Sequence, residues 1–147
     1  MSYEDQAKFW EGYLQEPQVV SYVTDIQGGR VVGFVTGGPK LLGAEKYKGE
    51  ITALYVREAF QRKGIGKKLM FLAVKSLKDH NLRPIIIWAL KESPYRVFYE
   101  KLGGTLVDET LRAFGDQKYP IVAYSWQNLD DLYKILLKEI LARANSR

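Results

Sequence analysis

The chain has 147 residues, of which 46% are apolar and 27% are charged, a composition typical of one soluble domain that can bury a core. It contains no cysteine, and His80 is its single histidine. The residues required for disulfide scaffolds, structural zinc sites, thiol nucleophiles and Ser-His-Asp triads are therefore absent or almost absent. We therefore expect no metal. No apolar run approaches the ~18 residues that a membrane span needs, and the acidic start is unlike a signal peptide. We expect a cytoplasmic protein with no membrane partner.

The net charge of +5 is concentrated in one segment of the chain. Residues 61–101 contain ten Lys or Arg against three Asp or Glu, whereas the remainder is mildly acidic. A surface for nucleic acid would spread this excess more widely, while a site for one polyanionic ligand would concentrate it. A solvated helix face also explains the lysines between residues 67 and 78, and no RNA or DNA motif is present. We therefore expect no nucleic-acid partner.

The first half of the chain predicts a helix followed by three strands. Phe9, Trp10 and neighbouring acids indicate a short amphipathic helix within residues 1–17, which Pro17 ends. Runs rich in Val, Tyr, Thr and Phe at residues 18–25 and 30–36 flank two glycines, a pattern typical of a β-hairpin. A third strand is expected at about residues 49–57, after a loop.

The second half alternates helices and strands. Apolar residues recur at helical spacing from Ile65 to about Asp79, and the uniformly apolar residues 85–90 predict a strand buried inside a sheet. A short helix is expected between Pro94 and Gly103, where proline and glycine suit its two ends. Two strands at residues 105–112 and 119–126, joined by a loop, and an amphipathic helix from Leu129 to about Ala144 complete the prediction.

This order of elements predicts an α/β (α+β) fold in a single domain over residues 1–147. The sheet should be mixed and mostly antiparallel, with a right-handed β-α-β crossover at its centre. Residues 18–127 form the predicted core, between an N-terminal helix at 1–17 and a C-terminal helix at 128–147.

A glycine-rich turn, Gln61-Arg62-Lys63-Gly64-Ile65-Gly66-Lys67, joins the third strand to the long helix. Glycines allow a tight turn, and the first N–H groups of a helix lack intrahelical partners and carry the positive end of its dipole, so phosphate oxygens are natural ligands there. The turn is not a Walker A loop, because Gly66-Lys67 is followed by Lys68. It is not a dinucleotide fingerprint either, because Leu69 stands where the third glycine is needed.

The form Gln/Arg-x-x-Gly-x-Gly/Ala resembles the pyrophosphate loop of the GNAT family of acetyl-CoA-dependent N-acetyltransferases. The resemblance extends over about residues 19–132. It includes the strand 49–56, the motif Ser93-Pro94-Tyr95-Arg96-Val97-Phe98-Tyr99-Glu100-Lys101-Leu102-Gly103-Gly104 and the closing run 123–129. It implies a GNAT-like fold with an added C-terminal helix. It also implies acetyl-CoA as co-substrate and transfer of its acetyl group to a primary amine, which we expect to belong to a small molecule.

The resemblance also assigns cofactor-binding residues. Splayed central strands in this family let pantetheine add to a strand edge like a further β-strand. Ser93 stands where many relatives carry Asn against pantetheine, and its hydroxyl has a shorter reach. The implied contacts to pantetheine come from Leu54, Tyr55, Val56, Ser93 and Tyr99. Those to the diphosphate come from Gln61, Arg62, Lys63, Gly64, Ile65, Gly66 and Lys67.

Two residues are implied to be catalytic, and each has a structural alternative. Tyr99 matches the family's tyrosine that protonates the departing thiolate, although Tyr95, Phe98, Tyr99 and Leu102 also form a helical stripe that would pack inward. Glu50 lies eleven residues before Gln61, like the general base of one branch of the family. It could instead pair with Lys46 or Lys48, leaving water as the base.

The N-terminus departs from the family pattern, because only one short helix precedes Gln18 and the usual first strand is missing from the prediction. We expect either that the C-terminal helix covers exposed core or that a second subunit completes the sheet in a homodimer. A catalytically inactive CoA-binding sensor is the alternative to an enzyme.

Overall fold

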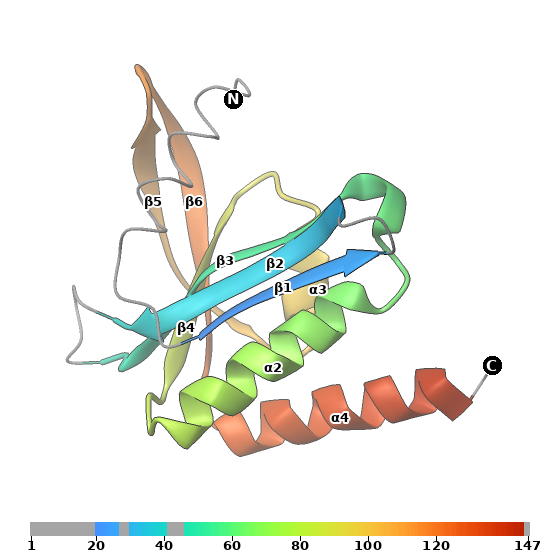
Figure 1. Cartoon of the computed structure of the whole chain (residues 1–147). Helices are drawn as coiled ribbons and strands as arrows, with labels where there is room; N and C mark the ends of the chain where they lie inside the picture. Colours follow the sequence, from blue (N-terminus) through green and yellow to red (C-terminus); the bar gives the residue numbers. More distant parts are fainter. Residues whose placement is uncertain (1–19, 27–29, 41–45, 146–147) are drawn as a thin grey trace.

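The computed structural model describes residues 20–26, 30–40 and 46–145. The expected N-terminal helix and the question of a first strand lie outside these residues. The described residues form a six-stranded sheet in the order β1-β2-β3-β4-β6-β5 (Figure 1). The strands are β1 (Val20–Ile26), β2 (Arg30–Pro39), β3 (Gly49–Val56), β4 (Ile85–Leu90), β5 (Thr105–Phe114) and β6 (Gln117–Trp126).

The predicted helices of the described segments are confirmed with almost the expected bounds. They are α2 (Ile65–Asp79), α3 (Tyr95–Lys101) and α4 (Leu129–Asn145), and a short 3-10 turn, η1 (Glu58–Phe60), precedes the glycine loop. Gly64 begins α2 with φ of 84° and Gly103 follows α3 with φ of 86°, so both use the left-handed conformation that favours glycine.

The last hairpin is longer than predicted. β5 runs to Phe114 and β6 starts at Gln117, so the connection is Gly115 and Asp116 alone, with Gly115 at φ of 65°. β5 is solvent-exposed along most of its length, which explains the error, because its sequence lacks the apolar alternation that marks a half-buried strand. Figure 1 shows this hairpin projecting from the rest of the sheet.

The centre of the sheet is the predicted β-α-β crossover, in which β3, α2 and β4 follow one another and the two strands are parallel. The strands pair over only three positions, Gly49 with Ile85, Glu50 with Ile86 and Ile51 with Ile87. Beyond this point β3 stays paired with β2 and β4 stays paired with β6, but residues 52–56 and 88–90 are not paired with each other. The sheet therefore opens between its two central strands.

One apolar core joins α2, α3 and α4 to a single face of the sheet. Its fully buried members include Met70 and Leu77 of α2, Tyr124 of β6, and Leu132 and Leu136 of α4. A smaller cluster of Tyr47, Ile86 and Ala123 lies on the other face. The C-terminal helix therefore packs on the core, while its substitution for a first strand stays a prediction, because residues 1–19 lie outside the described part of the chain.

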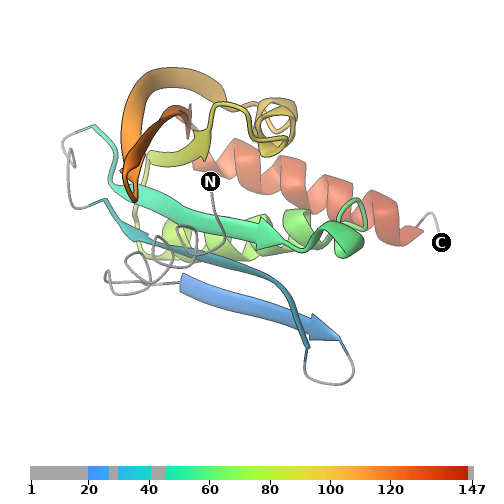
Figure 2. The ribbon, with the colours of Figure 1, turned by 90° about the horizontal axis from the view of Figure 1, so that it is seen from above.

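Helices α2 and α4 run antiparallel side by side (Figures 1 and 2). Ion pairs join them near both ends. Lys78 contacts Asp130 at 3.0 Å near the end of α2, and Lys67 contacts Glu139 at 3.3 Å near its start. The end of α4 therefore lies beside the glycine loop. Within the described part of the chain, no helix combines the length and apolar character needed to cross a membrane.

We expect Leu136→Ala to lower the free energy of unfolding by about 2–4 kcal/mol, because a fully buried leucine leaves a cavity when truncated. Leu141→Ala is the matched control, since Leu141 lies on the same helix and is 53% exposed. Urea unfolding followed by circular dichroism measures both. Equal small losses for the two variants would contradict the placement of α4 in the common core.

Candidate active site

The glycine loop turns the chain from the end of β3 into α2 through two left-handed residues, Arg62 with φ of 65° and Gly64 with φ of 84°. A non-glycine residue in this conformation is strained, and such strain is found preferentially at binding and catalytic sites. The first main-chain bond of α2 runs from Lys68 N to Gly64 O at 3.2 Å. The preceding N–H groups at the start of the helix therefore lack intrahelical acceptors and, with the positive end of the helix dipole, favour an anion.

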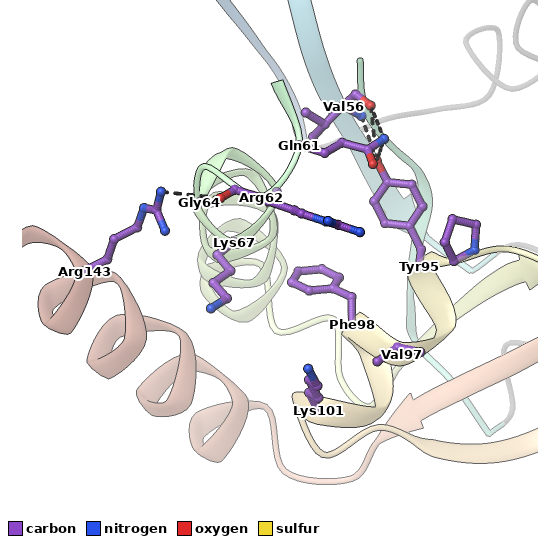
Figure 3. Close-up of a pocket in the computed structure, with 12 residues that line it drawn as sticks. Val56, Gln61, Arg62, Gly64, Lys67, Tyr95, Val97, Phe98, Lys101 and Arg143 are labelled. Carbon is purple, nitrogen blue, oxygen red and sulfur yellow. Dashed lines mark hydrogen bonds between the residues drawn. The ribbon is translucent and has the colours of Figure 1, made fainter. Parts of the chain in front are cut away.

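A cavity of about 600 Å³ opens in front of this loop (Figure 3). Four cationic residues from three parts of the chain line it: Arg62 and Lys67 from the loop and the start of α2, Lys101 from α3 and Arg143 from α4. No aspartate or glutamate is among the described residues that line it. The apolar part of the lining comes from Val56, Pro94, Val97 and Phe98. The cavity thus combines an apolar wall with positive charge, as suits a ligand that has both a hydrophobic arm and phosphate groups.

Helix α4 touches this loop through Arg143. Arg143 Nη2 donates a hydrogen bond to the carbonyl oxygen of Arg62 at 3.5 Å, and the Arg143 side chain lies against Gly64. A Cβ atom at position 64 would come within 2.8 Å of Arg143 Cδ. The missing side chain of Gly64 therefore serves two purposes, since it permits the positive φ and makes room for Arg143.

Tyr95 of α3 reaches across to the open edge of β3. Its hydroxyl accepts a hydrogen bond from Val56 N at 3.1 Å and donates one to Val56 O at 3.3 Å, while Gln61 Nε2 donates to Val56 O at 2.9 Å. Burial raises the pKa of the Tyr95 phenol, which therefore stays protonated and able to donate. The backbone groups of Val56 point away from β2, towards the opening between β3 and β4, and the side chains of Tyr95 and Gln61 satisfy them.

Tyr99 lies one helical turn further along α3 and is only 3% exposed. Its ring is surrounded by aromatic neighbours, with ring centroids 6.5 Å from Tyr95, 5.9 Å from Tyr124 and 6.3 Å from Trp126. Burial raises the pKa of Tyr99 well above its usual range near 10, so the phenol is neutral at physiological pH. The predicted inward stripe is confirmed, and Tyr99 is not among the residues that line the cavity.

Glu50 lies on the opposite face of the sheet from Tyr99, because it alternates with Ile51, which belongs to the core under α2. Its carboxylate lies 3.9 Å from Lys40 Nζ, and both side chains are mostly buried. The structure thus pairs Glu50 with a lysine other than the two that the sequence suggested. Lys40 follows β2 directly, and an antiparallel partner of this kind is not visible from spacing along one strand.

The structure divides the predicted cofactor-binding residues into two groups. Six line the cavity: Val56, Gln61, Arg62, Gly64, Gly66 and Lys67. The other six, Leu54, Tyr55, Lys63, Ile65, Ser93 and Tyr99, do not.

Several of this second group have other partners. Leu54 belongs to the buried core, Tyr55 is 43% exposed, and Lys63 Nζ lies 5.5 Å from the ring centroid of Phe60. Ser93 Oγ accepts a hydrogen bond from Tyr95 N at 3.1 Å, so this hydroxyl satisfies a donor at the start of α3. That bond uses one of the two acceptor positions of the atom that was expected to contact pantetheine.

Sequence reasoning missed six residues that line the cavity: Pro94, Tyr95, Val97, Phe98, Lys101 and Arg143. Five of them lie in or next to the motif around Tyr99 and could have been found from it, because α3 faces the glycine loop. Nothing in the sequence pointed to Arg143, which is 81 residues from its partner Arg62.

Comparison with solved structures shows which known proteins share this fold. The fold matches the "putative streptothricin acetyltransferase from Bacillus anthracis str. Ames in complex with acetyl coenzyme A", with a TM-score of 0.62, 17% identity, and coverage of 81% of this chain and 68% of that chain. It also matches the NatC complex bound to Gag peptide and CoA, with a TM-score of 0.62, 16% identity, and coverage of 87% and 80%. At these identities the likeness concerns the fold.

Sequence comparison gives the family. Residues 2–104 match the Acetyltransferase (GNAT) family, and the chain therefore belongs to this family. It is 28% identical over 115 residues to the "Uncharacterized N-acetyltransferase YuaI" of Bacillus subtilis (strain 168), which covers 78% of this chain. The chain spans 66% of that relative's length, slightly under two thirds.

Proposed function

We propose that this protein is an N-acetyltransferase that moves the acetyl group of acetyl-CoA directly to a primary amine of a small molecule. The observation that carries the proposal is the opening between β3 and β4 beside a cavity with four cations and no described carboxylate in its lining. Membership of the GNAT family and the acetyl coenzyme A held by a protein of the same fold support it.

The proposed cofactor position follows from the charges and the strand edge. The diphosphate lies on the N–H groups and cations of residues 62–67, where the helix dipole adds to the formal charges. Pantetheine extends along β3 towards the opening and takes over the backbone groups of Val56 that Tyr95 satisfies here. Leu54 is two residues away, so its backbone groups face the same side. An N–H group there polarises the acetyl carbonyl as negative charge develops on its oxygen.

The two catalytic candidates lie on opposite faces of the opened sheet, and this arrangement suits direct attack. The amine approaches from the face of Glu50 and loses a proton to that carboxylate, directly or through water. The new N–C bond forms and the C–S bond breaks. The departing thiolate then takes the proton of Tyr99, which solvent replaces. Burial raises the pKa of Tyr99, so the phenol carries the proton at physiological pH, and the same burial makes it a weaker acid than a free tyrosine.

The acceptor class is tested by measuring thiol release from acetyl-CoA across a panel of small primary amines and of peptides with a free N-terminal amine. The chain contains no cysteine, so a thiol-reactive chromophore reports only released CoA. We expect turnover with small amines and little with peptides. Acetyl-CoA should also raise the melting temperature, because it binds the native state.

Each contrary outcome removes a different part of the proposal. Turnover confined to peptides would replace the small-molecule acceptor by a protein amine, the chemistry suggested by the peptide-bound NatC complex of similar fold. A melting shift with no turnover on any amine would favour a CoA sensor. The absence of any shift would remove acetyl-CoA itself.

Replacement of the phenol by phenyl tests the proton donor. We expect Tyr99→Phe to retain the affinity for acetyl-CoA within about twofold and to lower kcat by roughly 10²-fold or more, the usual contribution of a positioned general acid. Steady-state kinetics and calorimetric titration measure the two quantities. Tyr133→Phe, which removes a phenol hydroxyl from a tyrosine packed against the core outside the cavity lining, is the control. An unchanged kcat for Tyr99→Phe would remove Tyr99 from the mechanism.

The Tyr95 hydroxyl competes with pantetheine for Val56, so its removal should favour the cofactor. We expect Tyr95→Phe to bind acetyl-CoA about fivefold more tightly, because one net hydrogen bond of about 1 kcal/mol no longer stabilises the unliganded state. Adenosine 3′,5′-bisphosphate, which lacks pantetheine, should bind both proteins equally. Equal tightening for the two ligands, or weaker binding of acetyl-CoA, would contradict this competition.

A further inference from the structure

The cationic residues of the cavity fall into two groups with different origins. Arg62 and Lys67 belong to the glycine loop and the start of α2, where the diphosphate is proposed to lie. Lys101 and Arg143 come from α3 and α4. In Figure 3 Arg143 lies at the left and Lys101 at the bottom, while the Arg62 side chain lies at the centre. Arg143 also lies beyond residues 2–104, the part of the chain that matches the family.

One positive charge of the glycine loop, that of Lys67, is partly neutralised by a carboxylate of α4. Glu139, one helical turn before Arg143 on α4, lies 3.3 Å from Lys67 Nζ. Both groups are partly exposed, so the pair is weak, but it places a carboxylate beside one of the two loop cations that line the cavity. The remaining charge of Arg62 and the N–H groups of the loop match a diphosphate. They leave little for the further phosphate that coenzyme A carries on its ribose.

Arg143 is placed to supply that charge. Its side chain lies against Gly64, and its Nη2 donates to the carbonyl oxygen of Arg62, which holds the guanidinium at the edge of the loop. A guanidinium carries five N–H donors in a planar fork that matches phosphate oxygens, and its charge persists at every physiological pH. A ribose phosphate carries between one and two negative charges near neutral pH, in the range known for phosphate monoesters.

We propose that Arg143 binds the 3′-phosphate of coenzyme A and thereby selects CoA over dephospho-CoA. The inference rests on the proposed position of acetyl-CoA and adds a specificity residue from the C-terminal helix. On this proposal the end of α4 has two roles beside the loop. Glu139 positions Lys67, and Arg143, one turn later, adds the charge that binds the 3′-phosphate.

The test compares the affinities of CoA and dephospho-CoA by calorimetry for the wild type, Arg143→Gln and Lys138→Gln. We expect Arg143→Gln to weaken CoA about tenfold, as for the loss of a charge-assisted hydrogen bond, and to change dephospho-CoA by less than twofold. Lys138→Gln removes an equal charge from an exposed position of the same helix and should change neither affinity. Arg143→Lys should restore part of the preference, since it keeps the charge without the fork.

The opposite outcomes are distinct. An equal loss for both ligands, or no loss for either, would overturn the assignment of Arg143 to the 3′-phosphate. A change of preference in Lys101→Gln but not in Arg143→Gln would move that role to α3. If the wild type bound neither ligand, the proposed function itself would fail, whatever the variants did.

Discussion

The parting of β3 and β4 after three parallel pairs is the constraint on which the site depends. Backbone N–H and C=O groups in a folded protein must find partners, and those of Val56 face the opening instead of a neighbouring strand. Tyr95 and Gln61 satisfy them, so α3 and the glycine loop are tied to the same point of the sheet edge. The opening is therefore built into the strand pairing, and any ligand that enters it must replace hydrogen bonds that already exist.

The proposed anion site depends on the same geometry, because the glycine loop follows the end of β3 and leads into α2. That loop carries two left-handed residues, Arg62 and Gly64. Helix α4 touches the loop where Arg143 lies against Gly64, and the position of α4 is fixed by leucines buried in the core that it shares with α2. The C-terminal helix therefore does more than cover the core, because its last turns also contact the glycine loop.

Local patterns in the sequence predicted the helices, the central strands and the glycine loop, since each of these elements is determined by residues that are close together in the chain. The periodicity of α2, the uniformly apolar β4 and the glycines of the loop are examples. The missed features depend on residues far apart in the chain. Arg143 meets Arg62, Lys40 meets Glu50, and the Tyr95 hydroxyl meets Val56 across the opening. Spacing within one segment contains no information on such pairs. β5 was predicted too short for a different reason, because an exposed strand carries no burial pattern.

Tyr95 and Tyr99 illustrate how two tyrosines on one helix can differ in role through position alone. Burial raises the pKa of both phenols, but only Tyr95 lines the cavity. Its two hydrogen bonds to Val56 replace bonds to water, and Gln61 Nε2 also donates to Val56 O, so the Tyr95 hydroxyl contributes only about 1 kcal/mol net. Pantetheine would form equivalent bonds on entry, so the exchange is nearly neutral, and most of the affinity must come from phosphates at the cationic loop. Tyr99 lies next to Tyr95, with ring centroids 6.5 Å apart, and is only 3% exposed. The role proposed for its phenol therefore requires that a bound cofactor reach it past the Tyr95 ring.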